Sequence, residues 1–268
     1  MTLEVTINGK NYEAEKGEYI LEVCRRNRIL VPTLCHHESL SGLGACRLCV
    51  VEVNEGSGNK VVVSCVYPLS KNCEVFTESA MIKGIRKTIL SMLRARAPEG
   101  DRLASLCRMY GVEEDRRFRI PRLRKGPAAK RRLSSACVLC GLCAQACAAL
   151  GSGAIATAGR GVAKKIATPY DKPSADCIGC GSCAEVCPTR AIKCRETKRK
   201  RYIWGRKFEL MECASCGTSF ATSEEYALAQ KKADTMPYDD LPLCEACRRK
   251  KSADVFAAAF GERTWFFT

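Results

Sequence analysis

Long apolar runs are missing from this sequence. The segment that follows Met1 already alternates between apolar and polar residues, and no later stretch is long enough to span a bilayer. We therefore expect no signal peptide, no transmembrane helix and a cytoplasmic location. Phe and Trp are also few, with 8 and 2 among 268 residues. A chain with so few of them has small cores, and bound metal is then expected to supply much of the folding free energy.

Recognisable catalytic motifs are missing as well. We find no nucleophile paired with a base, no glycine-rich dinucleotide loop, no flavin signature and no nickel motif. These absences predict a chain without a catalytic site of its own.

Acidic residues are outnumbered by basic ones, 29 to 44, which gives a formal net charge of +15. Bound iron–sulfur clusters with four thiolate ligands are anionic and would lower this value. Two basic runs, Arg116 to Arg132 and Lys193 to Lys207, indicate a solvated or partner-facing surface. Binding to nucleic acid is the alternative that the same runs leave open.

Cysteine, in contrast, is abundant, with 20 residues grouped in short motifs. In a chain without a signal peptide, grouped cysteines favour metal binding over disulfides. Two copies of the C-x2-C-x2-C-x3-C motif lie twenty-nine residues apart, which is typical of two [4Fe–4S] clusters whose fourth ligands are exchanged. We expect cluster A on Cys137, Cys140, Cys143 and Cys187, and cluster B on Cys177, Cys180, Cys183 and Cys147.

Another group of four cysteines comes earlier in the chain. Cys35 is followed after ten residues by Cys46-x2-Cys49, and Cys65 follows after fifteen more. This pattern is close to that of plant-type [2Fe–2S] ferredoxins, although the first gap is longer. We predict a [2Fe–2S] cluster on these four residues, with a zinc site as the alternative. His36 and His37 could tune that cluster or be plain surface residues.

Two C-x2-C pairs near the C-terminus form the last group. Cys213 and Cys216 are separated by twenty-seven residues from Cys244 and Cys247. This spacing predicts a closed tetrahedral zinc site in a zinc-ribbon-like module, and a further [4Fe–4S] cluster on the same residues is the alternative. The apolar residues Val255 to Phe260 and Trp265 to Phe267 could dock onto a partner or pack on their own domain. Cys24, Cys73, Cys107 and Cys194 have no assigned role, and we expect Cys24 and Cys107 to be core thiols.

Local patterns predict the elements that carry these groups. Residues 2–8 and 10–14 alternate around Asn8-Gly9, which indicates a β-hairpin. Apolar periodicity predicts helices over residues 18–28, 79–96 with Ser79 as N-cap, 101–110 and 222–232. Strands are expected at Val50 to Val53 and Lys60 to Val66.

Two stretches of this sequence resemble a known family. Val31-Pro32-Thr33-Leu34-Cys35-His36-His37-Glu38 and Gly44-Ala45-Cys46-Arg47-Leu48-Cys49-Val50-Val51-Glu52-Val53 resemble the N-terminal module of the large iron–sulfur subunit of respiratory complex I. The same module occurs in the diaphorase iron–sulfur subunit of NAD-reducing hydrogenases and in iron-only hydrogenases. The resemblance continues through Ile85-Arg86-Lys87 and Gly159-Arg160-Gly161 and covers about residues 1–194.

The resemblance also implies a further cluster, and at this point the sequence departs from the family. In the family, the helix corresponding to residues 79–96 leads to a [4Fe–4S] cluster held by one histidine and three cysteines. Here Arg96-Ala97-Pro98-Glu99-Gly100-Asp101 follows, without histidine, and Cys107 is the one cysteine downstream. One cysteine cannot hold a cubane, so we predict that this cluster is missing.

These observations together predict an α+β protein. We expect a β-grasp [2Fe–2S] ferredoxin-like domain at 1–78, a helical connector and basic linker at 79–135, a bacterial-ferredoxin-like domain with two [4Fe–4S] clusters at 136–195, and the four-cysteine module at 196–268. The resemblance implies an electron-transfer subunit of a multisubunit oxidoreductase, which exchanges single electrons with a flavin and NAD(P)-binding subunit or ferredoxin and with a hydrogenase, formate dehydrogenase or other reductase. A basic, metal-stabilised nucleic-acid-binding protein is the alternative.

Overall fold

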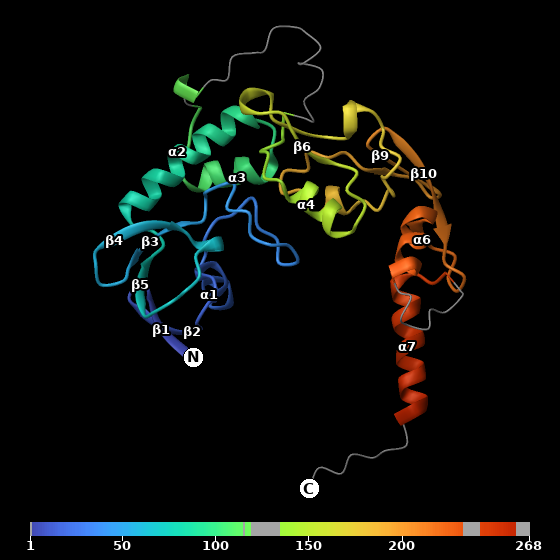
Figure 1. Ribbon diagram of the computed structural model, residues 1–268, viewed down its shortest axis with the longest axis horizontal. Helices are drawn as coiled ribbons and strands as arrows, with labels where there is room; N and C mark the ends of the chain where they lie inside the picture. Colours follow the sequence, from blue (N-terminus) through green and yellow to red (C-terminus); the bar gives the residue numbers. More distant parts are fainter. Residues whose placement is uncertain (1, 115, 119–134, 233–241, 261–268) are drawn as a thin grey trace. The chain divides into compact units, whose positions relative to one another are not determined.

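The computed structural model describes residues 2–114, 116–118, 135–232 and 242–260 (Figure 1). These residues form two compact units. The first comprises residues 1–172 and 182–193, and the second comprises residues 173–181 and 194–268. Both contain helices and strands, as expected for an α+β chain.

A five-stranded mixed sheet forms the N-terminal part of the first unit. Its strands are β1 (Thr2–Ile7), β2 (Lys10–Glu15), β3 (Val50–Asn54), β4 (Asn59–Val63) and β5 (Cys73–Phe76), in the order β2-β1-β5-β3-β4. β1 runs parallel to β5, and the other pairs are antiparallel. Asn8 and Gly9 both adopt positive φ, 49° and 81°, which confirms the predicted hairpin turn.

Helix α1 (Ile20–Arg26) covers this sheet and buries Ile20, Leu21, Val23 and Cys24. It is shorter than the predicted helix over residues 18–28. Cys24 is fully buried in the core with β-strand residues such as Val5 and Val75, which confirms that it is a core thiol.

Two helices follow the sheet, both close to their predicted bounds: α2 (Ala80–Arg96) and α3 (Asp101–Met109). The Ser79 hydroxyl accepts a hydrogen bond from the Ile82 amide at 3.2 Å, which is the expected N-cap. Leu90 of α2 and Leu103, Leu106 and Cys107 of α3 enter a second core, so Cys107 is also a buried core thiol.

The rest of the first unit is built from short elements, α4 (Leu142–Ala149), the hairpin β6 (Ala156–Ala158) and β7 (Lys165–Ala167), and α5 (Ser182–Glu185). Among the described residues, 3-10 turns lie at Ser64–Val66, Arg116–Phe118, Gly161–Ala163 and Pro169–Asp171. Most of the predicted basic linker, residues 119–134, lies outside the described residues.

An antiparallel sheet of four strands organises the second unit. Its strands are β8 (Arg195–Glu196), β9 (Lys200–Ile203), β10 (Arg206–Glu212) and β11 (Ser219–Thr222), in the order β11-β10-β9-β8. Two helices follow, α6 (Ser223–Lys232) and α7 (Glu245–Phe260), and α6 confirms the helix predicted over residues 222–232.

Several predictions about surfaces concern this unit. The second basic run, Lys193 to Lys207, supplies β8, β9 and the start of β10. Val255 and Phe256 lie on α7 and are 62% and 65% exposed, whereas Trp265 to Phe267 lie outside the described residues. Within the described part of the chain, no helix combines the length and apolar character that crossing a membrane requires.

Candidate iron–sulfur and metal sites

The four N-terminal cysteines of the predicted [2Fe–2S] site are all buried. Cys35, Cys46 and Cys49 lie in the long connection between α1 and β3, and Cys65 lies in the 3-10 turn after β4. Main-chain amides approach two of the sulfurs: the Cys46 amide donates to Cys35 Sγ at 3.2 Å, and the Leu34 amide donates to Cys46 Sγ at 3.4 Å. Such amide donors stabilise thiolate sulfur and inorganic sulfide alike.

The electrostatics of these thiols divide them into two pairs. A hydrogen bond from Cys35 is the main cause that lowers the pKa of Cys46 to about 6, against the opposing effect of burial. Likewise, a hydrogen bond from Cys65 lowers the pKa of Cys49 to about 7. The donor thiols Cys35 and Cys65 have raised pKa values because they give those hydrogen bonds and are buried. Each pair therefore holds one sulfur ready to be a thiolate, which is the form that binds iron.

The loop around these cysteines is tightly packed. A Cβ on Gly42 would lie 2.6 Å from the Cys65 carbonyl oxygen, so only glycine fits at this position. The Ser64 hydroxyl donates to the Cys49 carbonyl at 2.7 Å and joins the two parts of the site. Helix α2 contributes Arg86, whose buried guanidinium donates to the Leu48 carbonyl at 3.0 Å and to the Val50 carbonyl at 2.8 Å.

The two histidines next to Cys35 are half-buried. His37 Nδ1 accepts a hydrogen bond from the Ser39 amide at 3.2 Å. Burial, with a smaller contribution from Arg25, lowers the pKa of His36 and favours its neutral form.

Cluster A is predicted on four cysteines that all belong to the first unit. Cys137 and Cys140 precede α4, Cys143 lies in its first turn, and Cys187 follows α5. Burial, followed by the nearby thiols, raises the pKa of Cys140 to about 11 and that of Cys143 to about 12. Cys137 and Cys187 are among those nearby thiols in both cases, so Cys187 lies near the thiols of the first motif.

The backbone around these cysteines has the shape of a loop that wraps an inorganic core. Leu139 and Gly141 adopt positive φ, 55° and 86°, and Gly141 is the N-cap residue directly before α4. The Ala191 amide donates to Cys187 Sγ at 3.2 Å. Several thiols in a loop of this curvature, with an amide directed at sulfur, fit a [4Fe–4S] cluster.

The residues predicted for cluster B are described unit by unit. In the first unit, Cys147 is on α4 one turn after Cys143, with its sulfur 3.8 Å from the Ser152 hydroxyl, and Cys183 is buried on α5. In the second unit, Cys177 is buried and Cys180 is half-buried, on a segment where Gly179 and Gly181 have positive φ.

The predicted [2Fe–2S] site and the predicted cluster A site share one core within the first unit. Cys46 is among the groups that raise the pKa of Cys140, and both residues lie in the core that also contains Cys35. The Gln145 side-chain amide donates to the Ser41 carbonyl at 3.0 Å, and a Cβ on Gly141 would lie 3.2 Å from Leu43 Cδ1. These contacts join the loop of the first site to the start of α4.

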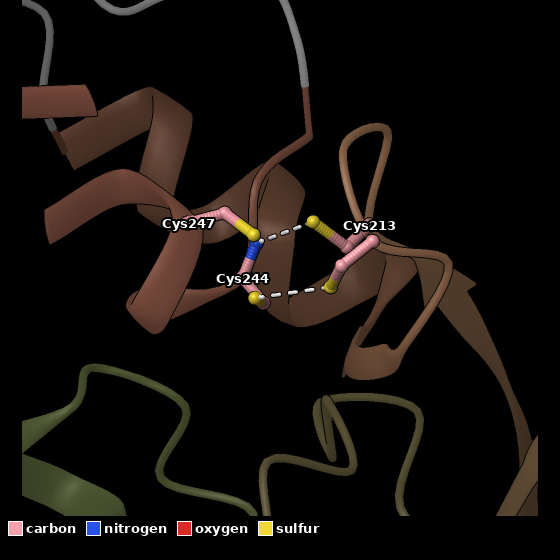
Figure 2. A group of neighbouring side chains, drawn as sticks. Cys213, Cys244 and Cys247 are labelled. Carbon is pink, nitrogen blue, oxygen red and sulfur yellow. Dashed lines mark hydrogen bonds between the residues drawn. The ribbon is translucent and has the colours of Figure 1, made fainter. Parts of the chain in front are cut away.

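The four C-terminal cysteines meet at one point in the second unit. The sulfurs of Cys213, Cys216, Cys244 and Cys247 all lie within 4.8 Å of one another. In Figure 2, Cys213 lies in the turn after β10 and faces Cys244, which directly precedes α7, and Cys247, which lies in its first turn. The Cys244 amide donates to Cys213 Sγ at 3.3 Å and is the main cause that lowers the pKa of Cys213 to about 6. This chemistry suits a metal with four thiolate ligands.

The residues that support these sites escaped the sequence analysis. Arg86 was visible only as part of a resembling stretch. Arg201 and Arg206 were visible only as members of the second basic run, and Gln145 and Thr222 carried no signal for this role. Each acts on main-chain carbonyls that are distant in sequence.

Comparisons with known proteins agree with the two ferredoxin-like regions. Residues 1–80 match the 2Fe-2S iron-sulfur cluster binding domain family, and residues 136–191 match the 4Fe-4S dicluster domain family. The predicted presence of both kinds of iron–sulfur domain is therefore confirmed. Neither match extends to the four C-terminal cysteines.

Individual relatives confirm the resemblance as well. The NADH-ubiquinone oxidoreductase 75 kDa subunit of Reclinomonas americana is 36% identical over 96 residues, which is 36% of this chain and 14% of that protein. The NAD-reducing hydrogenase HoxS subunit gamma of Cupriavidus necator is 32% identical over 111 residues, 41% of this chain and 44% of that protein. The chain thus matches less than half the length of these relatives.

A solved structure shares the fold over a larger part of the chain. A chain in the crystal structure of NAD+-reducing [NiFe]-hydrogenase in the H2-reduced state has a TM-score of 0.53 and 27% sequence identity, and the likeness covers 62% of this chain and 74% of that chain.

Proposed function

We propose that this chain is an iron–sulfur electron-transfer subunit of a multisubunit oxidoreductase. The relatives that it resembles are subunits of an NADH-ubiquinone oxidoreductase and of an NAD-reducing hydrogenase. The observation that carries the proposal is the shared core of the first unit, where Cys46 of one predicted site and Cys140 of another are electrostatic neighbours. Two redox sites this close form a route for electrons rather than two independent structural sites.

The proposed cofactors are one [2Fe–2S] cluster and two [4Fe–4S] clusters, each of which accepts and passes on one electron when bound. The ligands are Cys35, Cys46, Cys49 and Cys65 for the first, Cys137, Cys140, Cys143 and Cys187 for cluster A, and Cys177, Cys180, Cys183 and Cys147 for cluster B. In this arrangement Gly42, Ser64 and Arg86 shape the first site, and the Ala191 amide stabilises a thiolate of cluster A.

The histidine-ligated cluster of the family has no counterpart in this proposal. The two histidines of the sequence, His36 and His37, both precede α2, and α3 follows α2 with apolar residues in the shared core. Cys107 lies fully buried among them, and burial raises the pKa of its thiol. Electrons therefore pass directly between the [2Fe–2S] site and cluster A, through the contacts around Gly141 and Gln145.

Zinc is the metal that we propose for the four C-terminal cysteines. A tetrahedral ion with Zn–S bonds of about 2.3 Å separates its ligand sulfurs by roughly 3.8 Å. The sulfurs of Cys216 and Cys244 are 3.7 Å apart, and all four lie within 4.8 Å of one another. A cubane would place its own iron and sulfide atoms between the thiolates and push them farther apart. This spacing supports the zinc-ribbon-like role over a third [4Fe–4S] cluster.

The proposed partners are other redox subunits. We expect a flavin and NAD(P)-binding subunit or ferredoxin on one side, and a hydrogenase, formate dehydrogenase or other reductase on the other, in the cytoplasm. The chain then needs no catalytic site of its own.

Anaerobic purification of the tagged full-length chain from its host tests this function. The expected result is copurification of a flavoprotein. NAD(P)H or ferredoxin should then reduce the clusters, and EPR spectroscopy monitors this reduction. Reduction by dithionite but by no copurifying partner contradicts the proposal. A steep salt-dependent affinity for DNA or RNA, with no redox partner, favours the nucleic-acid-binding alternative.

A further inference from the structure

Side chains of the second unit's sheet hold the segment that carries Cys177 and Cys180. Arg206, the first residue of β10, donates from one guanidinium nitrogen to the carbonyls of Ser174, at 3.0 Å, Ala175, at 2.9 Å, and Cys177. The guanidinium also lies over the Phe208 ring, 4.6 Å from its centroid.

The next two carbonyls of the segment are held in the same way. The Thr222 hydroxyl of β11 donates to the Ile178 carbonyl at 2.5 Å, and Arg201 of β9 donates to the Gly179 carbonyl at 2.9 Å. Arg201 is itself fixed, because its Nε donates to Glu196 at 2.8 Å and a second nitrogen lies 3.5 Å from Glu225. Phe208 packs so closely that a Cβ on Gly179 would lie 2.6 Å from its ring.

These hydrogen bonds from Arg206, Thr222 and Arg201 determine which way the peptide groups of residues 177–180 face. The chain has no cis peptide bond among its described residues, and in a trans peptide the N–H points away from the C=O. Because the carbonyls of Cys177, Ile178 and Gly179 are directed at the sheet, the amides of Ile178, Gly179 and Cys180 face the opposite side. Amides in a cysteine loop that face away from the sheet are available to cluster sulfur.

We infer that three side chains of the C-terminal sheet, Arg201, Arg206 and Thr222, position the loop that carries Cys177 and Cys180. By orienting its amides they raise the reduction potential of the cluster that these cysteines bind. Amide hydrogen bonds to sulfur and nearby positive charge both stabilise the reduced, more negative state of a cluster. Arg201 pairs with Glu196 and Glu225, and Arg206 lies 4.0 Å from Glu224, so their charge is largely balanced and their main effect, together with Thr222, is to orient the amides. All three are positioning residues, since they act through the main chain. The inference rests on the proposed function only in taking Cys177 and Cys180 as cluster ligands.

Potentiometric EPR titration of the anaerobically purified full-length chain tests this inference. Arg201→Gln removes the charge and the forked donor, so one [4Fe–4S] midpoint potential should become more negative while the others stay unchanged. Arg201→Lys keeps the charge and should shift the same midpoint less; it also provides the measurement if the glutamine variant does not retain iron. Arg199→Gln is the matched control, because Arg199 precedes the same strand, is 73% exposed and pairs with Glu212. That control should leave every midpoint where it is.

Two results overturn the inference: no midpoint moves in either Arg201 variant, or Arg199→Gln moves the same midpoint as far as Arg201→Gln. Cys180→Ser separates this outcome from failure of the proposed ligand set. If Cys180→Ser keeps the full iron content and every EPR signal, the cluster assignment itself fails. If Cys180→Ser loses one cluster while the Arg201 variants leave that cluster's potential unchanged, only the inferred effect of the sheet on the potential fails.

Discussion

Arg86 donates a hydrogen bond from its Nε to the main-chain carbonyl of Leu48, which lies between Cys46 and Cys49. The guanidinium is fully buried, and another of its nitrogens donates to the Val50 carbonyl. A third donates to the Tyr110 hydroxyl at 2.9 Å, next to the end of α3. One side chain of α2 thus fixes the loop of the predicted [2Fe–2S] site and ties it to both connector helices.

Replacing Arg86 should therefore damage that site. Arg86→Met leaves the Leu48 and Val50 carbonyls buried without these donors, at a cost of about 1–3 kcal/mol each. We expect a lower midpoint of urea denaturation and a weakened [2Fe–2S] EPR signal, with the [4Fe–4S] signals less affected. Lys87→Met is the control, because Lys87 is exposed on the same helix, and it should change stability by no more than about 0.5 kcal/mol. Equal effects of the two substitutions would show that Arg86 does not position the loop.

The same substitution at two glycines should have opposite effects. Gly42→Ala places a Cβ 2.6 Å from the Cys65 carbonyl oxygen, so the loop and Cys65 must move apart and iron occupancy of the first site should fall. Gly84→Ala, in the interior of α2, meets no atom within 4 Å and should stabilise the protein by about 0.5–1 kcal/mol. Thermal unfolding and iron analysis of both variants check this pair. A destabilised Gly84→Ala variant would mean that α2 is more crowded than its contacts indicate.

Cys107→Ala should leave the iron content and the EPR spectrum unchanged. Cys107 is fully buried on α3 in an apolar core, so the substitution removes the packing of one sulfur and its hydrogen bond with Arg94, with an expected cost of about 1 kcal/mol. Iron analysis and EPR of the anaerobically purified variant make the comparison. Loss of a cubane signal would identify Cys107 as a ligand and restore a cluster between α2 and α4.

Exchange of the fourth ligands can be tested by two serine variants. If Cys147 serves cluster B, Cys147→Ser should disturb one [4Fe–4S] signal and Cys140→Ser the other. The physical reason is that α4 begins at Leu142 and carries Cys147 one turn away from its own loop. Loss of the same signal in both variants would show that the fourth ligands are not exchanged, although electron transfer could still proceed.

Metal analysis distinguishes the C-terminal site from the others. We expect about ten irons per chain, from one [2Fe–2S] and two [4Fe–4S] clusters, and about one zinc. Cys213→Ser should remove the zinc and keep the iron, whereas Cys194→Ser, at an exposed cysteine outside the motifs, should change neither. An iron content of roughly fourteen, one cubane more, would reassign the four cysteines to an iron–sulfur cluster.

The helices and the hairpin of this chain were predictable because their signals are local. Asn8-Gly9 supplies two residues that tolerate positive φ, and Ser79 precedes an apolar stripe with a side chain that can cap it. Helix α1 proved shorter than predicted, since apolar spacing alone does not determine where a helix ends.

The sequence by itself determined the groups of cysteines, because cluster ligands in one loop must follow one another at short, regular spacing. Only the tertiary structure decided what surrounds them. Arg86 reaches Leu48 across 38 residues, and Arg201 reaches Gly179 across 22. Their acceptors are main-chain carbonyls, which every residue carries, so no residue pattern marks them. The same holds for the close approach of Cys216 to Cys244, because the distance between two knuckles depends on how the chain folds between them.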